Sequence, residues 1–378
     1  MRPRVYLDHH ATTGLSAAAR DAMRPLLDEA LVGNASSAHH FGRRARSLLD
    51  DARIAVARSI GAAPAEVTLC SGGTEAAHLA VLGLGRGAPP SSLWCDPGAH
   101  PCVVAAMEAL ALERSVALRW IPTGGEGAVD VAALAEALTD GALVALSWVQ
   151  HETGAVLDLA PLRALFAARG ARWVLDGVQA LGKIPVAVAA TGADAVTFSA
   201  HKIGGPPGVG ALWARGGARL AAVLPGGGQE RGLRGGTENL LGAVGFGAAA
   251  AEVPSRLAAM PAVGARRDLI ERALRAAGAS PSIVARERAA TVSHVAWPSG
   301  AAGAELVAAF DVEGVAVSAG SACSSGRARA SASIARTYPA EPWRASGALR
   351  VSLSPGTTDA EVERFVEVAG AILPRFFR

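Results

Sequence analysis

The sequence predicts an α/β protein whose main sheet is mostly parallel and is flanked by helices. Short apolar runs recur between residues 66 and 214, and longer segments of helical period lie between several of them. Glycines and polar residues follow the apolar runs. Strands that alternate with helices favour parallel pairing, with the polar turns gathered at one edge of the sheet.

The elements follow one another along the chain. Strands are expected at residues 66–70, 92–95, 116–121, 142–149, 172–176, 195–199 and 210–214. Helices are expected at 74–84, 101–113, 130–139 and 159–169, and the pattern is again helical from about 240 to 278. We predict a large domain over residues 16–251 and a smaller α+β domain made of residues 1–15 and 252–378.

The composition excludes several classes of protein. Of 378 residues, 51% are hydrophobic and 18% are charged, which is typical of a globular chain. The net charge of +3 is small and the arginines are scattered, so we expect no direct binding to nucleic acid. We expect no membrane span and no signal peptide, since no apolar run is long enough. The four cysteines lack metal-ligand spacing and indicate free thiols in a cytoplasmic protein without a metal site.

Polar groups follow the predicted strands. Ligands of parallel sheets bind there, beyond the carboxyl ends of the strands. In "SGGTE", Gly73 and Thr74 could bind an anion at the start of a helix. Taken alone, that turn is better explained as an ordinary helix cap. Asp176 ends another strand, and could either cap a helix or pair with a buried cation such as a protonated pyridine nitrogen.

Lys202 is one of only two lysines among 36 basic residues. A lysine amine can lose its proton and form a Schiff base with a carbonyl, which an arginine cannot do. Ser199 and His201 flank it with groups able to hold phosphate oxygens, and glycines follow. This combination predicts a lysine that binds pyridoxal 5'-phosphate. Lys183 lacks such neighbours, and we expect it to be a solvated surface residue.

Eight motifs give the chain a resemblance to a known family. They are "YLDHHATT", "GNASSAHHFGRRAR", "SGGTEAAHLAVLG", "LDGVQALGKIPV", "SAHKIGGPPGVGALW", "GGGQERGLRGGTEN", "SAGSACSSG" and "LRVSLSPGTTDAEVE". In this order they resemble the cysteine desulfurases, which are fold-type I pyridoxal phosphate enzymes of the class V aminotransferase group. The short "GSAC" form is similar to the subgroup that serves nitrogen fixation and iron–sulfur cluster assembly. The resemblance implies conversion of L-cysteine to L-alanine, with sulfur passed to an acceptor protein for iron–sulfur cluster assembly or for thiolation of tRNA.

The resemblance implies a role for the residues around the cofactor. Lys202 matches the Schiff-base lysine, and Asp176 matches the carboxylate that pairs with the pyridine nitrogen. Gln179 matches the side chain at the cofactor's phenolic oxygen. His100 matches the histidine that stacks on the ring and relays protons. The residues that match the phosphate cradle are Gly73, Thr74, Ser199 and His201.

The resemblance also implies residues for the substrate and for a subunit contact. Arg350 matches the arginine that binds the substrate carboxylate. Cys323 matches the nucleophile, whose thiolate takes the sulfur as a persulfide. Thr237 matches a residue that reaches the cofactor phosphate of the neighbouring subunit, which implies a homodimer with shared sites. Cys70 and Cys102 have bulky apolar neighbours, and we expect both to be buried thiols.

A few positions depart from the family pattern. His151 stands in "QHE", where the family usually has Asn-Asn-Glu, and is expected beside the cofactor oxygen or the substrate. His9 also replaces a common asparagine, and Asn34, expected at the substrate, lacks the usual proline after it. The segment that follows Cys323 is more basic than expected. These departures indicate a specialised sulfur acceptor or an altered choice of substrate.

Two other interpretations stay open. One is another class V enzyme, namely a selenocysteine lyase, a cysteine sulfinate desulfinase or an aminotransferase, of which the last would not need Cys323. The other is a non-catalytic sulfur-relay scaffold, against which the intact Lys202, Asp176 and Arg350 argue. A metalloenzyme is disfavoured because "HETGA" is not H-E-x-x-H.

Overall fold

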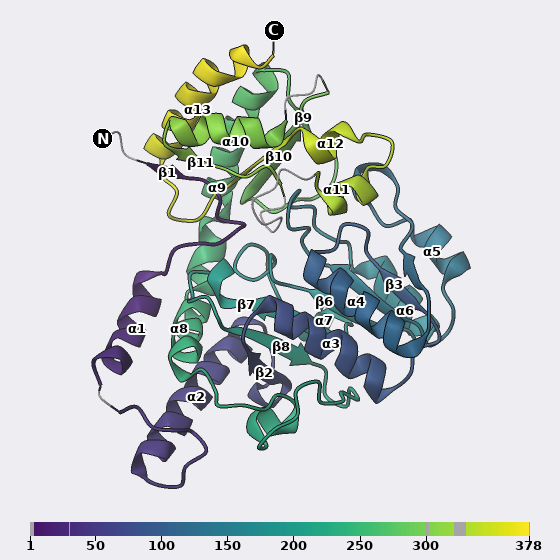
Figure 1. Cartoon of the computed structure of the whole chain (residues 1–378), viewed down its shortest axis with the longest axis vertical. Helices are drawn as coiled ribbons and strands as arrows, with labels where there is room; N and C mark the ends of the chain where they lie inside the picture. Colours follow the sequence, from purple (N-terminus) through teal and green to yellow (C-terminus); the bar gives the residue numbers. More distant parts are fainter. Residues whose placement is uncertain (1–3, 30, 299–301, 321–329, 378) are drawn as a thin grey trace.

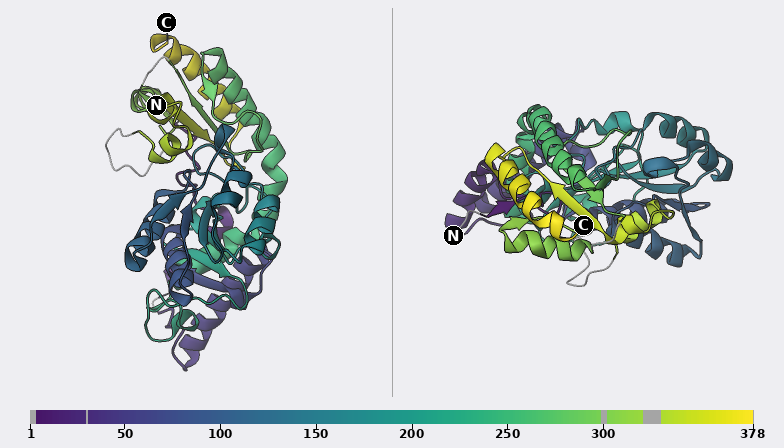
Figure 2. Two further views of the ribbon diagram at one scale, coloured as in Figure 1. Left: turned by 90° about the vertical axis from the view of Figure 1, so that its right-hand side faces the viewer. Right: turned by 90° about the horizontal axis from the view of Figure 1, so that it is seen from above.

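The protein has a larger part built on a seven-stranded sheet and a smaller part stacked on it, which holds the C-terminus (Figure 1). The computed structural model describes residues 4–29, 31–298, 302–320 and 330–377. The views in Figure 2 show the same two parts from the side and from above.

The main sheet has the strand order β2-β8-β7-β6-β5-β3-β4. Its strands are β2 (Val67–Cys70), β3 (Leu93–Cys95), β4 (Leu118–Trp120), β5 (Leu143–Ser147), β6 (Arg172–Asp176), β7 (Ala195–Ser199) and β8 (Gly210–Ala214). From β4 to β7 the neighbours are parallel, and β8 runs antiparallel to both β7 and β2. The seven predicted strands are confirmed, and so is the mostly parallel sheet.

Helices cover both faces of this sheet, because its central strands are apolar on both faces. The helices of this part are α1 (Ala17–Asp28), α2 (His40–Ser59), α3 (Gly73–Gly87), α4 (Pro101–Arg114), α5 (Val131–Ala137), α6 (Ala160–Ala168), α7 (Val188–Thr191) and α8 (Leu240–Ala251). Along β5, Leu143 and Ala145 pack in a core with α3 and α4, which lie in front of the sheet in Figure 1. Val144 and Leu146 pack in a second core with α2, α6 and α8. The four predicted helices between these strands are confirmed.

The smaller part has its own apolar core, which includes a stacked pair of rings, Phe310 and Phe365. Its strands are β1 (Val5–Tyr6), β9 (Ser280–Pro281), β10 (Val292–Ala296), β11 (Val315–Ala316) and β12 (Ala348–Ser352). Its helices are α9 (Val253–Ala276), α10 (Gly303–Val312), α11 (Ala332–Thr337), α12 (Trp343–Ser346) and α13 (Asp359–Ile372). β1 pairs with β11, so the start of the chain joins this core. The domain limits given above stay a prediction, which the separate cores support.

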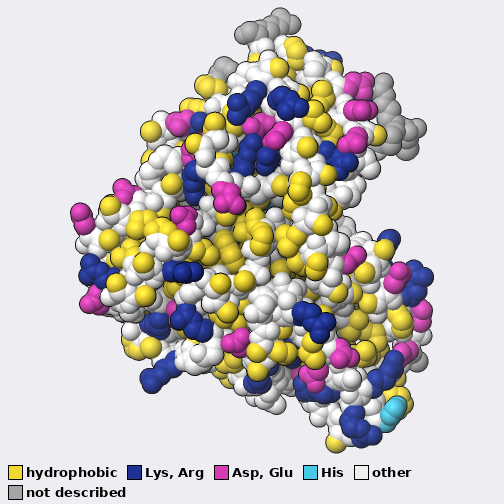
Figure 3. All heavy atoms as spheres, turned by 180° about the vertical axis from the view of Figure 1, so that it is seen from behind, with side chains coloured by type: hydrophobic (Ala, Val, Ile, Leu, Met, Phe, Trp, Pro, Cys, Tyr) yellow, Lys and Arg dark blue, Asp and Glu magenta, His cyan; other side chains and the backbone are white. Residues whose placement is uncertain are grey.

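The surface shows mixed charge. On the face opposite to that of Figure 1, a band of apolar side chains crosses the middle, and Lys and Arg are interspersed with Asp and Glu around it (Figure 3). Within the described residues, no helix is long and apolar enough to span a membrane.

Candidate active site

A cavity of about 220 Å³ lies at the carboxyl ends of the central strands. Because these strands are parallel, the turns that follow them meet at one edge of the sheet. β6 ends at Asp176 and β7 ends at Ser199. The predicted residues that line the cavity are Gly73, Thr74, His100, His151, Asp176, Gln179, Ser199, His201 and Lys202. One edge of the sheet therefore gathers most of the predicted site.

Lys202 lies in a 3-10 turn, Ala200–Lys202, directly after β7. Its Nζ donates hydrogen bonds to the backbone oxygens of His10, at 2.6 Å, and Ala11, at 2.7 Å. Gly204 has a φ of +89°, which favours glycine, and its carbonyl accepts from Ser16 N. The N-terminal segment is thus bound to the turn that carries the lysine.

Asp176 is held at the end of β6 by two hydrogen bonds. Its Oδ1 accepts from the backbone nitrogen of Val178, at 3.0 Å, and from Thr197 Oγ1, at 3.1 Å. Burial raises the pKa of Asp176 above its ordinary value, and these bonds offset only part of that effect. A cationic partner in the cavity would favour the ionised carboxylate.

His100 caps helix α4 and contributes a neutral imidazole. Its Nδ1 accepts from the backbone nitrogen of Cys102, at 3.2 Å, so the ring proton is assigned to Nε2. Burial lowers the pKa of His100 to about 3, and the charges of His151 and Lys202 add to the shift. The rings of His100 and His151 meet edge to face, with centroids 5.0 Å apart.

The prediction that Cys102 is a buried thiol is wrong. Cys102 is half-buried and lines the cavity, and its Sγ lies 3.0 Å from Nδ1 of His100. Its place in the first turn of α4 brings the side chain to the cavity wall. Cys70 is buried as predicted, and burial raises the pKa of its thiol to about 12.

Glu152 is a buried carboxylate that the sequence did not single out. Its Oε1 lies 3.4 Å from Nε2 of His151 and accepts hydrogen bonds from the hydroxyls of Ser331 and Ser333. Although burial alone would raise it, the neighbouring His151 ring and the hydroxyl of Ser331 hold the pKa of Glu152 well below its usual range. The carboxylate joins the cavity wall to helix α11, which Ser331 caps.

Arg350, on β12, lies next to the cavity rather than in its lining. The buried guanidinium donates from Nη2 to Asp8 Oδ1, at 2.8 Å, and from Nη1 to the carbonyl oxygen of His151, at 3.3 Å. Its Nε has no hydrogen-bond partner among the described residues. Arg350 is therefore a buried cation that touches the backbone of a cavity residue.

The prediction that Lys183 is a solvated surface residue is also wrong. Lys183 is only 5% exposed, and its Nζ donates to Oε1 of Gln179. The Nε2 of Gln179 donates in turn to the carbonyl oxygen of His10, at 2.9 Å. The turn after β6 is thus bound to the N-terminal segment through Gln179, and Lys183 is buried next to this contact.

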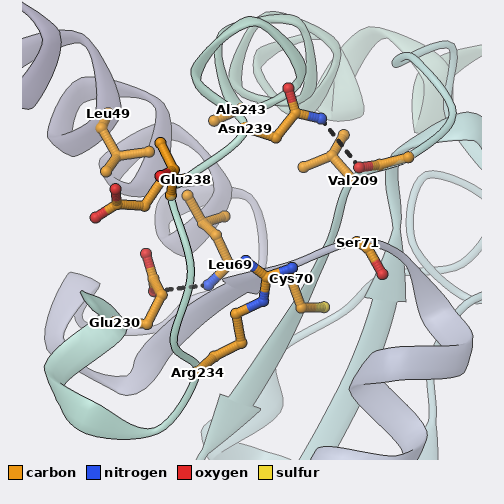
Figure 4. Close-up of a pocket in the computed structure, with 12 residues that line it drawn as sticks. Leu49, Leu69, Cys70, Ser71, Val209, Glu230, Arg234, Glu238, Asn239 and Ala243 are labelled. Carbon is orange, nitrogen blue, oxygen red and sulfur yellow. Dashed lines mark hydrogen bonds between the residues drawn. The ribbon is translucent and has the colours of Figure 1, made fainter. Parts of the chain in front are cut away.

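Among the described residues, two more predicted site residues, Thr237 and Asn34, lie outside the lining of this cavity, as Arg350 does. Thr237 lines another cavity of about 150 Å³, together with Arg234 and Glu238, which Figure 4 shows. Asn34 lies in an exposed turn, where its Oδ1 accepts from Ser36 N at 2.8 Å. Cys323 lies outside the described residues.

The donor set fits pyridoxal phosphate. The N-terminus of α3 and the hydroxyls of Thr74 and Ser199 can bind an anion. Gly73 leaves room for the anion at the helix N-terminus, because a Cβ there would lie only 2.9 Å from Val178 Cγ2. Lys202 offers an amine for an aldehyde, and Asp176 a carboxylate for a ring cation. Among the described residues, no group of three or more His, Cys, Asp or Glu could hold a metal ion.

The buried His294, on β10, should make the free energy of unfolding depend on pH. It is buried, with Nδ1 2.8 Å from Ser282 Oγ, and burial lowers its pKa to about 4. Below a pH of about 6.5 the unfolded chain takes up a proton that the folded chain does not, so this stability is present above pH 6.5 and is lost toward pH 4. The expected slope is at most about 1.4 kcal/mol per pH unit. The free energy of unfolding in urea is measured between pH 7.5 and 4.5 for the wild-type protein and for His294→Asn. In His294→Asn this free energy should fall less steeply as the pH is lowered. The same pH dependence in the two proteins would contradict the assignment.

Comparisons with known proteins place the chain among similar sequences and folds. The family model of class V aminotransferases matches residues 5–365. The chain is 39% identical to a cysteine desulfurase of Cereibacter sphaeroides, over 98% of this chain and 96% of that protein. It is 34% identical to an IscS-like cysteine desulfurase of Mycobacterium tuberculosis, over the same shares. A solved NifS-like protein, 26% identical, superposes with a TM-score of 0.90 over 98% of this chain and 100% of that one. The NifS-like protein of Rickettsia africae, also 26% identical, gives 0.87 over 98% and 99%.

Proposed function

The chain belongs to the class V aminotransferase family, among its cysteine desulfurases, and on this premise we propose that it converts L-cysteine to L-alanine and carries the sulfur as a persulfide on Cys323. The observation that carries the proposal is the cavity at the sheet edge, which joins the amine of Lys202, the carboxylate of Asp176 and an anion-binding helix N-terminus. These groups supply what a pyridoxal phosphate enzyme requires of its protein.

The residues of this cavity would hold the cofactor. Bound pyridoxal phosphate supplies an aldehyde that captures amines and a ring that withdraws electrons from the substrate's α-carbon. The phosphate is assigned to the first turn of α3, which contains Gly73 and Thr74, and to Ser199 and His201 beside it. Asp176 would favour a protonated ring nitrogen, because its buried carboxylate would gain a cationic partner there. Gln179 would offer an amide N–H to the ring oxygen.

Lys202 and His100 are the groups that move protons. Lys202 Nζ is bound to backbone carbonyls in a wall of the cavity, where it can accept the α-proton of the substrate and return it. His100 stays neutral down to acidic pH and can pass the proton on its Nε2. The two side chains line the same cavity, so both can reach one small substrate.

Arg350 is assigned to the carboxylate of L-cysteine. Its planar fork suits a carboxylate, and the bond from Nη1 to the His151 carbonyl ties it to the cavity wall. Asp8 holds the guanidinium at 2.8 Å and keeps it oriented. His151, in place of the family's usual asparagine, is assigned to the same end of the cavity.

The sulfur step needs no outside oxidant. The Cys323 thiolate attacks the sulfur of L-cysteine, so that an S–S bond forms and the substrate's C–S bond breaks. The electron pair of that C–S bond stays on carbon, which takes up a proton. L-cysteine and the enzyme thiol thus give L-alanine and an enzyme persulfide. The thiolate rather than the thiol is the attacking form.

The test is to follow both products with L-cysteine whose sulfur is isotopically labelled. The wild-type protein should form alanine and retain label on Cys323, and Cys323→Ser should retain none. Incubation with L-selenocysteine and with L-cysteine sulfinate tests the other class V activities. Alanine formation by wild-type protein without label on Cys323 would exclude the persulfide route, and no alanine at all would exclude the activity.

The partners follow from the same proposal. We expect a homodimer, because Thr237 lies outside the Lys202 cavity and is free to serve the site of a second subunit. The sulfur acceptor is expected to be a scaffold or carrier protein of iron–sulfur cluster assembly or of tRNA thiolation. A cytoplasmic location stays a prediction from the free thiols of Cys70, Cys95 and Cys102.

A further inference from the structure

The burial of Lys183 is unfavourable on its own. Removing an ammonium group from water is unfavourable unless other contacts compensate. Burial lowers the pKa of Lys183 well below its usual value. The charged groups that act on it add to this effect, because all are positive: Lys202, Arg256 and Arg350. We therefore expect the N–H groups of this buried lysine to make a specific hydrogen bond that offsets the unfavourable burial.

The contact that Lys183 makes is with a residue of the cavity. The turn that begins at Gly177 coils back on itself, with Ile184 N bonded to Ala180 O, so Gln179 and Lys183 stand side by side. Nζ of Lys183 donates to Oε1 of Gln179. Gln179 is 4% exposed, lines the cavity and lies beside Lys202 in its lining.

This contact fixes which way the Gln179 amide points. An amide side chain has an accepting oxygen and a donating nitrogen, and its two orientations differ by a half turn. Lys183 binds the oxygen, and the carbonyl of His10 receives the nitrogen at 2.9 Å. The same carbonyl also accepts from Nζ of Lys202. With both ends engaged, the nitrogen end of Gln179 is held on the side of Lys202 and His10.

We propose that Lys183 is a positioning residue: it holds the nitrogen end of the Gln179 amide on the cavity side, so that the N–H not taken by His10 favours an anionic ring oxygen of the bound cofactor. This inference rests on the proposed function, since it requires pyridoxal phosphate in the cavity. A half turn of the amide would present Oε1 to that oxygen, and two acceptors would then face each other. Lys183 touches neither cofactor nor substrate in this scheme and acts through Gln179.

The test measures cofactor binding and colour rather than turnover. Pyridoxal phosphate is titrated into wild-type apoprotein, Lys183→Met, Gln179→Leu and the double variant, and the absorbance of each complex is followed across pH. Lys183→Met should bind the cofactor about tenfold more weakly, since the Gln179 amide is no longer held as a donor to the anionic ring oxygen. Its colour change should move to higher pH by about one unit, because the anionic oxygen loses a donor. Lys183→Gln, which keeps an N–H donor, should restore most of the wild-type midpoint.

The double variant separates positioning from other effects. In the Gln179→Leu background, Lys183→Met should change neither affinity nor midpoint, because Lys183 then has no amide to orient. Full additivity would show a through-space or purely structural effect and would overturn the proposal. Wild-type affinity and midpoint in Lys183→Met would also overturn it. A wild-type protein that gains no colour with pyridoxal phosphate would overturn the proposed function, and this inference with it.

Discussion

Lys202→Ala is expected to reduce turnover of L-cysteine by about 10⁴-fold or more, because it removes both the covalent attachment of the cofactor and the group that moves the α-proton. In the structure, Nζ of Lys202 is bound to the carbonyls of His10 and Ala11 in the wall of the cavity. The chain has only one other lysine, Lys183, whose amine is engaged by Gln179. No second amine can therefore take over by a small movement.

Borohydride reduction followed by peptide mass spectrometry measures the attachment directly. Wild-type protein should gain the mass of reduced cofactor on the peptide that carries Lys202, and Lys202→Ala should gain none. Lys202→Arg keeps the positive charge and should be equally inactive, since a guanidinium does not form an imine. Lys183→Met is the matched control and should still be labelled at saturating cofactor. Labelling of Lys202→Ala at another residue would refute the assignment.

Asp176→Asn is expected to lower turnover by about 10³-fold, the size of effect found when one preorganised electrostatic group is removed from a buried site. The amide can still accept at Oδ1 from the backbone of Val178 and from Thr197, so the fold is kept. What is lost is the negative charge that holds a proton on the ring nitrogen. The measurement is kcat with saturating L-cysteine, alongside thermal unfolding.

Two results distinguish this explanation from general damage. Asp176→Asn should unfold within a few degrees of wild-type protein and should still form the Lys202 adduct, because neither depends on the charge. Asp176→Glu, which keeps the charge on a longer side chain, should retain more activity than Asp176→Asn. An Asp176→Asn protein with a tenth or more of the wild-type kcat would mean that no ring nitrogen is paired with this carboxylate.

The sequence predicted the main sheet and much of the cavity because the responsible signals are local. Apolar runs of strand length mark β5 to β7, and parallel strands bring their carboxyl ends together, so Asp176, Ser199 and Lys202 could be grouped in advance. The family resemblance added His100 and Gln179, which no periodicity would have found. Arg350 was predicted to bind the substrate carboxylate, which stays a prediction; the structure places it outside the cavity lining, against the backbone of His151.

The residues that were missed depend on contacts between distant parts of the chain. Gln179 Nε2 reaches a carbonyl 169 positions away, and Lys183 is buried against this same Gln179. Ser331 is 179 positions from Glu152, whose carboxylate it binds. Lys183 was expected in solvent because its local sequence lacks the phosphate-holding groups that flank Lys202, and nothing in that local sequence indicates its burial.

The segment from Asp8 to Ala11 determines whether the large domain can be transferred to another protein on its own. It pairs through Asp8 with Arg350 and offers backbone oxygens to Lys202 and Gln179, while the strand before it, β1, pairs with β11 of the smaller part. Transplanting residues 16–251 into a different protein would carry the sheet and the lysine, yet leave behind the carbonyls that hold that lysine. Chimaeras between relatives therefore need to exchange the first fifteen residues with the large domain and not only with the small one.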